Sequence, residues 1–220
     1  LARFERLLAG GARDPGATLL HALKGEMPEQ QLFELASWYL GCGERDAALR
    51  LLVGVGEHPE ALYWRALLEP EQAAGLRARA DALSPVRVLP FRPEILDAIA
   101  AAQAGAPTIW QRSWYLALGQ WHAGNLEVAG RLLAGVGDRP EYAPLYAARA
   151  AFPGRTAPER RADLERAAQL DPGQWRYGRL LVEELLRAKD PAGAVAMAAR
   201  YRTAFPENYI LGLGLARAFL

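Results

Sequence analysis

Three serines and three histidines are the side chains with which this sequence could perform hydrolytic or metal chemistry. A serine hydrolase needs its nucleophile in a Gly-x-Ser-x-Gly turn, and none of the three serines lies in one. The histidines His21, His58 and His122 have no second His three or four residues away and no nearby Cys. Zinc sites depend on such spacings. The sequence therefore predicts neither serine hydrolysis nor a metal site.

Gly-x-Gly pairs and neighbouring carboxylates could bind phosphate or perform acid–base catalysis. None of the Gly-x-Gly pairs follows a strand pattern or leads into Lys-Ser or Lys-Thr, so no phosphate-binding loop is predicted. We interpret these glycines as turns or close helix contacts. The adjacent Glu183 and Glu184 are a pattern common on helix surfaces, and we expect both to be solvated. We thus predict no enzyme, no catalytic residue and no cofactor.

Tryptophan is the residue type with some functional interest. Trp110, Trp114 and Trp121 are spaced at i, i+4 and i+11, which places them on one face of a helix over residues 108–123. The simpler interpretation is core packing against the next helix. The alternative is an aromatic wall of a binding groove.

Composition and charge exclude several classes of protein. The chain has 220 residues, of which 51% are hydrophobic. Its 43 Ala and 35 Leu outnumber its Val, Ile and Thr about fivefold, which predicts an all-α fold. A formal net charge of +1 gives no field that would attract nucleic acid. No uncharged run is long enough for a membrane span, and we expect the single Cys42 to be buried.

Proline, aspartate and glycine mark the ends of the predicted helices. Asp14, Asp171 and Asp190 each precede a proline, a pattern typical of a helix start, and Asp138 with Glu141 forms a capping-box pattern. The Gly-Val-Gly segments at 54–56 and 135–137 are predicted to end helices. The predicted helices span residues 2–9, 15–24, 29–41, 44–53, 58–68, 70–82, 92–104, 108–123, 126–134, 140–151, 157–169, 173–188, 191–204 and 207–220.

Internal repetition is the strongest signal in the sequence. The segment RLLVGVGEHPE at 50–60 recurs 81 residues later as RLLAGVGDRPE at 131–141, with eight of eleven positions identical. A second period of 34 residues relates Leu164 to Ala198 and Ala167 to Tyr201, and it also relates Pro172 to Pro206. Thirty-four residues is the length of one tetratricopeptide hairpin.

With this period the chain resembles the tetratricopeptide repeat (TPR) family, although the Trp-Leu-Gly pattern of the first helix is only partly kept. The resemblance implies a right-handed α-solenoid of about seven antiparallel hairpins in one domain over residues 1–220. Residues 84–93, SPVRVLPFRP, are predicted to form an extended, non-helical crossing because they contain three prolines.

The apolar residues 209–220, YILGLGLARAFL, form a predicted first helix without a second helix or a polar cap. Together with the start at Leu1, this leads us to expect a fragment of a longer protein. The fragment is expected to self-associate through that exposed helix.

A narrower resemblance is carried by LFELASWYL, HPEALYWRALL, WYLALGQWHAGNLEVAGRLL, RPEYAPLYAARAAF and ADLERAAQLDPGQWR. These segments look like the C-terminal helical region of large bacterial proteins with an N-terminal β-supersandwich domain of unknown function. That domain is similar to those of carbohydrate-active proteins, and the resemblance supplies no catalytic residue.

TPR geometry implies a concave groove lined by first helices, with aromatic side chains followed by an arginine cluster. Such a groove suits an acidic or aromatic peptide of a protein partner, or other domains of the same chain. The alternative is a helical accessory region of a carbohydrate-active or glycan-binding protein. A receptor for chaperone tails is disfavoured, because the groove lacks the Asn and Lys set. The predicted groove residues are Trp114, Trp121, His122, Tyr142, Arg149, Arg176, Arg179, Glu183 and Arg187.

Overall fold

A computed structural model describes residues 1–105, 108–210 and 213, and these residues contain α-helices, one short 3₁₀-helix and no β-strand. The predicted all-α class and the helices predicted between residues 2 and 204 are confirmed, and most ends agree within three residues. The α-helices are α1 (Ala2–Ala9), α2 (Pro15–Ala22), α3 (Glu29–Gly41), α4 (Arg45–Val55), α5 (Pro59–Leu68), α6 (Ala73–Ala82), α7 (Pro93–Gly105), α8 (Trp110–His122), α9 (Leu126–Val136), α10 (Ala143–Ala151), α11 (Ala157–Leu170), α12 (Trp175–Arg187) and α13 (Pro191–Ala204).

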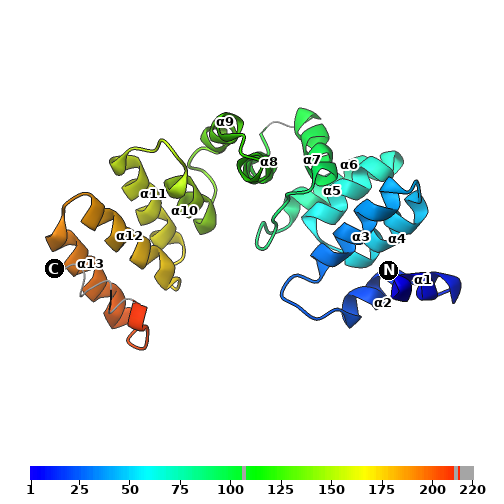
Figure 1. The fold of residues 1–220 in the computed structure, drawn as a ribbon. Helices are drawn as coiled ribbons and strands as arrows, with labels where there is room; N and C mark the ends of the chain where they lie inside the picture. The colour runs from blue at the N-terminus through cyan, green and yellow to red at the C-terminus, as the bar shows by residue number, and fades with distance from the viewer. Residues whose placement is uncertain (106–107, 211–212, 214–220) are drawn as a thin grey trace. The chain divides into compact units, whose positions relative to one another are not determined.

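The chain divides into two compact units, which are described separately. The N-terminal unit spans Leu1–Val136 and the C-terminal unit spans Gly137–Leu220. Within each unit, helices that follow one another pack as hairpins (Figure 1). These hairpins are α3/α4, α5/α6 and α8/α9 in the N-terminal unit, and α10/α11 and α12/α13 in the C-terminal unit.

The N-terminal unit contains the irregular members of the array. Helix α2 packs on α4, and α7 packs against both α5 and α8. Large side chains of α3, α5 and α8 form the core: Phe33, Trp64 and Tyr115 are at most 2% exposed. Arg112 of α8 is also buried, and its Nη2 lies 2.6 Å from Asp81 Oδ2 of α6. A buried charge pair thus links two hairpins of this unit.

Helices α2 and α4 approach closely because both have a glycine at the contact. A Cβ atom on Gly54 would lie 2.4 Å from the Cα of Gly16. Gly54 and its repeat equivalent Gly135 both lie inside helices, α4 and α9, whereas the sequence predicted helix ends there. The helices end two residues later, where Gly56 and Gly137 have φ angles of +77° and +70°.

A crossing without helix connects α6 to α7, between Ala82 and Pro93, at the place predicted from three prolines. Val88 is 2% exposed, and the backbone N–H of Leu89 donates to Glu60 Oε1 of α5 at 3.1 Å. The fully buried Glu60 also accepts from Gln30 Nε2 at 3.3 Å, while its second oxygen has no partner among the described residues. The crossing is thus held to the core by a buried carboxyl group.

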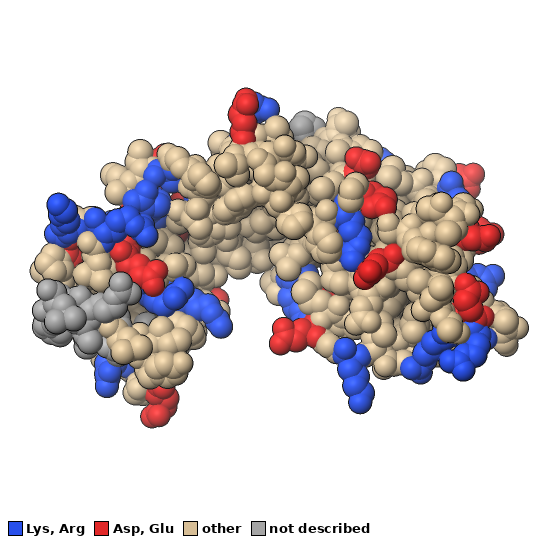
Figure 2. Space-filling view, viewed as in Figure 1, with Lys and Arg blue, Asp and Glu red and all other residues tan. Residues whose placement is uncertain are grey.

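The core of the C-terminal unit follows the 34-residue period. Leu164 and Ala167 of α11, and their equivalents Ala198 and Tyr201 of α13, are all buried, and they lie on the second helix of each hairpin. Basic side chains gather on this unit's face in Figure 2, with acidic ones beside them. The sequence of Gly137–Leu220 contains 13 basic and 10 acidic residues. This unit is therefore the positively charged part of the chain.

Some predicted helix starts are correct and others are wrong. Asp14 and Asp190 cap α2 and α13 by accepting from backbone N–H groups at 2.9 and 2.8 Å. Asp171 instead ends α11, and α12 begins only after Gln174. Asp138 does not cap α10, because that helix begins only at Ala143, after Tyr142; its carboxylate is paired with Arg149.

Three further expectations concern exposure and the chain's end. Cys42 is exposed, against the prediction of burial. Nine residues of the predicted C-terminal helix, 211–212 and 214–220, lie outside the described residues, so self-association through it stays a prediction. No helix in the described part of the chain combines the length and apolarity needed to cross a bilayer.

The two repeat-related glycines should respond oppositely to alanine. Gly54→Ala should destabilise the protein by several kcal/mol, because the new Cβ would meet the backbone of α2 at 2.3 Å. The Cβ atom added by Gly135→Ala would have no neighbouring atom within 4 Å, so this substitution should be neutral or stabilising by up to about 1 kcal/mol. Urea denaturation followed by circular dichroism measures both, and equal effects would contradict the close approach of α2 and α4.

Glu60 should make stability depend on pH. Burial raises its pKa from 4.5 to about 7, although the Leu89 N–H, Arg92 and Gln30 act in the opposite direction. The folded state therefore holds a proton that the unfolded state loses, and stability should fall as pH rises from 4.5 to 7. Glu60→Gln imitates the protonated form.

The variant's stability relative to the parent should therefore increase by about 2 kcal/mol between pH 5 and pH 8. Urea titrations of both proteins at each pH measure this difference and cancel contributions of other groups. A difference that does not change with pH would refute it.

Candidate functional site

One face of α12 carries the predicted arginine cluster. Arg176, Arg179, Glu183 and Arg187 are separated by three or four residues, so they share one side of the helix. The structure places these four side chains on the solvent side of α12, with side-chain exposures of 44% for Arg179, 40% for Glu183 and 60% for Arg187. The opposite side is buried and contains Tyr177, Leu181, Val182 and Leu185.

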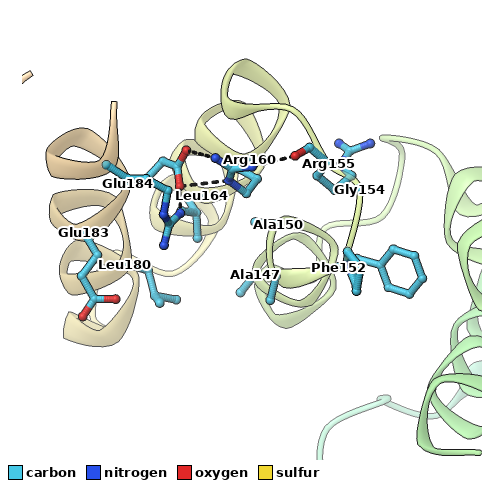
Figure 3. Close-up of a pocket in the computed structure, with 13 residues that line it drawn as sticks. Ala147, Ala150, Phe152, Gly154, Arg155, Arg160, Leu164, Leu180, Glu183 and Glu184 are labelled. Atoms are coloured by element: carbon cyan, nitrogen blue, oxygen red, sulfur yellow. Dashed lines mark hydrogen bonds and ion pairs between the residues drawn. The ribbon is translucent and has the colours of Figure 1, made fainter. Parts of the chain in front are cut away.

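A pocket of about 460 Å³ lies between α10, α11 and α12 (Figure 3). Small side chains of α10 form one wall, and Glu183 and Arg187 of α12 belong to the other. The close-up shows Glu183 pointing away from α11 and Phe152 at the far edge. The lining residues are Ala147, Ala150, Ala151, Phe152, Pro153, Gly154, Arg155, Arg160, Leu164, Leu180, Glu183, Glu184 and Arg187.

Glu184 is the buried charge of this pocket, with only 3% of its surface exposed. It accepts from Arg160 of α11 through two bonds, Nε at 3.0 Å and Nη2 at 2.8 Å. It also accepts from Arg187 Nη1. The hydrogen bond to Glu184 raises the pKa of Arg160. One carboxylate thus fixes two guanidinium groups at the pocket.

The pocket retains donor groups that no protein atom uses. Each guanidinium nitrogen of Arg160 has a partner, since its Nη1 also donates to the carbonyl of Arg155 at 2.6 Å. Arg187 has no partner for its Nε or Nη2 among the described residues. Arg155 Nε is buried and also lacks a partner there. Arginine donors arranged beside an apolar wall can bind a carboxylate carried by an apolar group.

Arg149, a predicted groove residue, lies in the interior, and this corrects the prediction. Its Nε is 3.0 Å from both oxygens of Asp163 in α11, and its Nη2 is 2.6 Å from Asp138 Oδ1. Burial lowers the pKa of Arg149, but the bonds to Asp163 and Asp138 outweigh this and raise it above its usual range. Its Nη1 donates to the carbonyl of Gly137 at 3.0 Å. Arg149 therefore joins α10 to α11 and does not face a ligand.

The other predicted groove residues are divided between the two units. Trp114 and Trp121 of α8 belong to the N-terminal unit; Trp114 is 4% exposed and so lies in the core, and Trp121 is half-buried. His122 is exposed, with its ring 5.8 Å from that of Phe91. Tyr142 precedes α10 in the C-terminal unit and is half-buried, which raises its pKa. The candidate site is therefore confined to the α10–α12 pocket.

Sequence reasoning missed Glu184, Arg155 and Arg160. We expected Glu183 and Glu184 to be solvated alike, but Glu184 lies three residues after the buried Leu181 and shares its side of α12. On the surface of α11, Arg161 pairs with Glu165 at 2.9 Å. Asp163 of the same helix pairs with Arg149 and Arg155. A signal for Glu184 existed in the helix period, whereas the partners of Asp163 come from other segments.

The described residues, 1–105, 108–210 and 213, contain no group of three or more His, Cys, Asp or Glu side chains that could hold a metal ion.

Comparison with known proteins gives likenesses of fold. No protein-family model and no curated protein matches the chain. A solved TPR protein of Thermus thermophilus, TTC0263, is 22% identical, with 87% of this chain and 98% of that chain covered and a TM-score of 0.46. Two structures of MamA from Desulfovibrio magneticus RS-1 are 18% identical, with 82% of this chain and 96% of theirs covered and TM-scores of 0.45 and 0.46.

Breaking the Arg149–Asp163 pair should strongly destabilise the C-terminal unit. Arg149→Met leaves the 3% exposed Asp163 without its closest partner, which typically costs about 3 kcal/mol or more. Arg161→Met, which removes the exposed pair with Glu165, should cost less than about 1 kcal/mol. Chemical denaturation of the two variants compares a buried with an exposed pair on the same helix. Similar losses would contradict a structural role for Arg149.

Proposed function

We propose that this chain is a non-catalytic protein-interaction module and that its C-terminal unit binds an acidic segment of a protein partner in the α10–α12 pocket. The observation that carries the proposal is the free edge of the Arg187 guanidinium, whose Nε and Nη2 have no partner among the described residues. Such an edge matches the two oxygens of a carboxylate.

The walls of the pocket favour a ligand that is only partly charged. Ala147 and Ala150 of α10, together with Leu164 and Leu180, offer apolar surface beside the arginines. An Asp or Glu with an apolar neighbour could therefore place its carboxylate on Arg187 and its neighbour against these alanines and leucines. The excess of basic over acidic residues in this unit would also increase the rate of association with an acidic partner.

The proposal uses only part of the predicted groove. Arg176, Arg179 and Glu183 would extend the contact along α12, since they share its solvent side. Tyr142, Trp121 and His122 stay predicted contacts. Trp114 and Arg149 take no part, because their side chains are buried.

Fluorescence polarisation with labelled twelve-residue peptides tests the proposal. Each probe carries two Glu residues among Leu and Ala, with the spacing varied across the set, and each has a matched peptide with Gln in place of Glu. We expect binding of at least one acidic probe, and a tenfold or greater loss of affinity for its Gln counterpart and in Arg187→Glu. Arg202→Glu, an exposed arginine of α13 outside the pocket, is the matched control and should change affinity less than twofold.

Two results would contradict the proposal. One is that no acidic probe binds the parent protein. The other is that Arg187→Glu and Arg202→Glu weaken binding equally, which would mean that general charge rather than the pocket attracts the peptide.

A further inference from the structure

The two adjacent glutamates of the pocket, Glu183 and Glu184, differ in their exposure and in their contacts with arginines. Glu183 is 40% exposed at its side chain, and its contact with Arg179 is long, at 3.6 Å. Glu184 is 3% exposed and accepts hydrogen bonds from two arginines. The formal charge of the two residues is the same, so a difference in their effect on binding must come from geometry.

Glu184 is held firmly from α11. Arg160 Nε and Nη2 bind its two oxygens at 3.0 and 2.8 Å, and the third nitrogen of Arg160 donates to the carbonyl of Arg155. The Arg155 side chain is in turn tied to Asp163 at 2.8 Å. Each group in the chain of contacts from Glu184 through Arg160 and Arg155 to Asp163 has a protein partner. The Glu184 carboxylate is therefore a stationary acceptor on the wall of the pocket.

Arg187 is the most exposed of the charged groups linked to Glu184. Its side chain is 60% exposed, and within the described residues its one polar contact is between Nη1 and Glu184. A free arginine side chain loses rotamer entropy when it is fixed. A contact made before the ligand arrives lowers that cost at the moment of binding. The contact through Nη1 also leaves the opposite Nε–Nη2 edge directed away from Glu184.

We propose that Glu184 is a positioning residue, which holds Arg187 so that its free edge faces the pocket and thereby strengthens binding of an acidic segment. This inference rests on the proposed function, which supplies the acidic ligand. The geometry of Arg187 can be tested without a ligand. It leads to an expectation opposite to simple charge counting, by which removal of any glutamate from the pocket strengthens binding of an anion.

Neutralising the two glutamates separately distinguishes these expectations. With the acidic probe that the parent protein binds best, Glu183→Gln should increase affinity about twofold, because it removes a repelling charge. Glu184→Gln should decrease affinity at least fivefold. In an Arg187→Ala background, Glu184→Gln should no longer decrease affinity, since its effect acts through that arginine. Thermal unfolding of each variant establishes that it is folded at the temperature of the binding assay.

A ligand-free measurement tests the geometry by itself. In protein labelled with ¹⁵N-arginine, the Nε–H signal of Arg187 should have a high order parameter in the parent and in Glu183→Gln. It should have a low one in Glu184→Gln. If Glu184→Gln proves unfolded, Arg187→Lys replaces it: lysine keeps the charge but lacks the free edge, and the variant should bind at least fivefold more weakly.

The outcomes separate the two proposals. The positioning role is overturned if the parent protein binds an acidic probe and Glu184→Gln, or Arg187→Lys in its place, binds it equally or more tightly. This result leaves the proposed function intact. A mobile Arg187 side chain in the parent also overturns it. Failure of every acidic probe to bind, with a rigid Arg187, overturns the proposed function alone.

Discussion

The C-terminal unit depends on buried carboxylates that each bind two arginines. Asp163 accepts from Arg149 and Arg155, and Glu184 accepts from Arg160 and Arg187. At each carboxylate one arginine side chain is more deeply buried than the other. The exposures are 11% for Arg149 and 27% for Arg155 at Asp163, and 24% for Arg160 and 60% for Arg187 at Glu184. A carboxylate removed from water needs such partners, because an unpaired buried charge is strongly destabilising. The same bonds that join α10, α11 and α12 therefore also decide which guanidinium edge remains available at the pocket.

Segments that are related by the internal repeat pack differently against their neighbours. Gly54 lies against Gly16 in a contact between backbones, whereas the repeat-related Gly135 has open space around it. Glu60 is fully buried and binds the crossing, whereas its equivalent Glu141 is exposed. A buried arginine that pairs with an aspartate does occur in both units, as Arg112–Asp81 and as Arg149–Asp163. The repeat thus preserved helix ends and a turn, while the partners of individual side chains depend on the neighbouring helices.

This difference explains what could be predicted from the sequence. The helices and the crossing follow from local sequence signals, such as the proline after Asp190 and the glycines Gly56 and Gly137, which have positive φ angles in the structure. The exposed face of α12 follows from the period of one helix. Arg149 was assigned to the groove wrongly because its position on α10 cannot reveal that Asp163 and Asp138, 14 and 11 residues away, converge on it. Local spacing fixes which side of a helix a residue takes, and tertiary contacts decide whether its charge is already used.

The same reasoning applies to the electrostatics of the site. Three arginines and two glutamates line the pocket, which by formal charge is close to neutral, as is the whole chain with its net charge of +1. Glu184 and Arg160 neutralise each other through two short bonds, and Glu183 is only loosely associated with Arg179. The guanidinium nitrogens of the lining arginines that have no partner among the described residues are Nε and Nη2 of Arg187 and the buried Nε of Arg155. The binding that we propose for an acidic segment therefore rests on donors that have no protein partner, which a count of charges does not reveal.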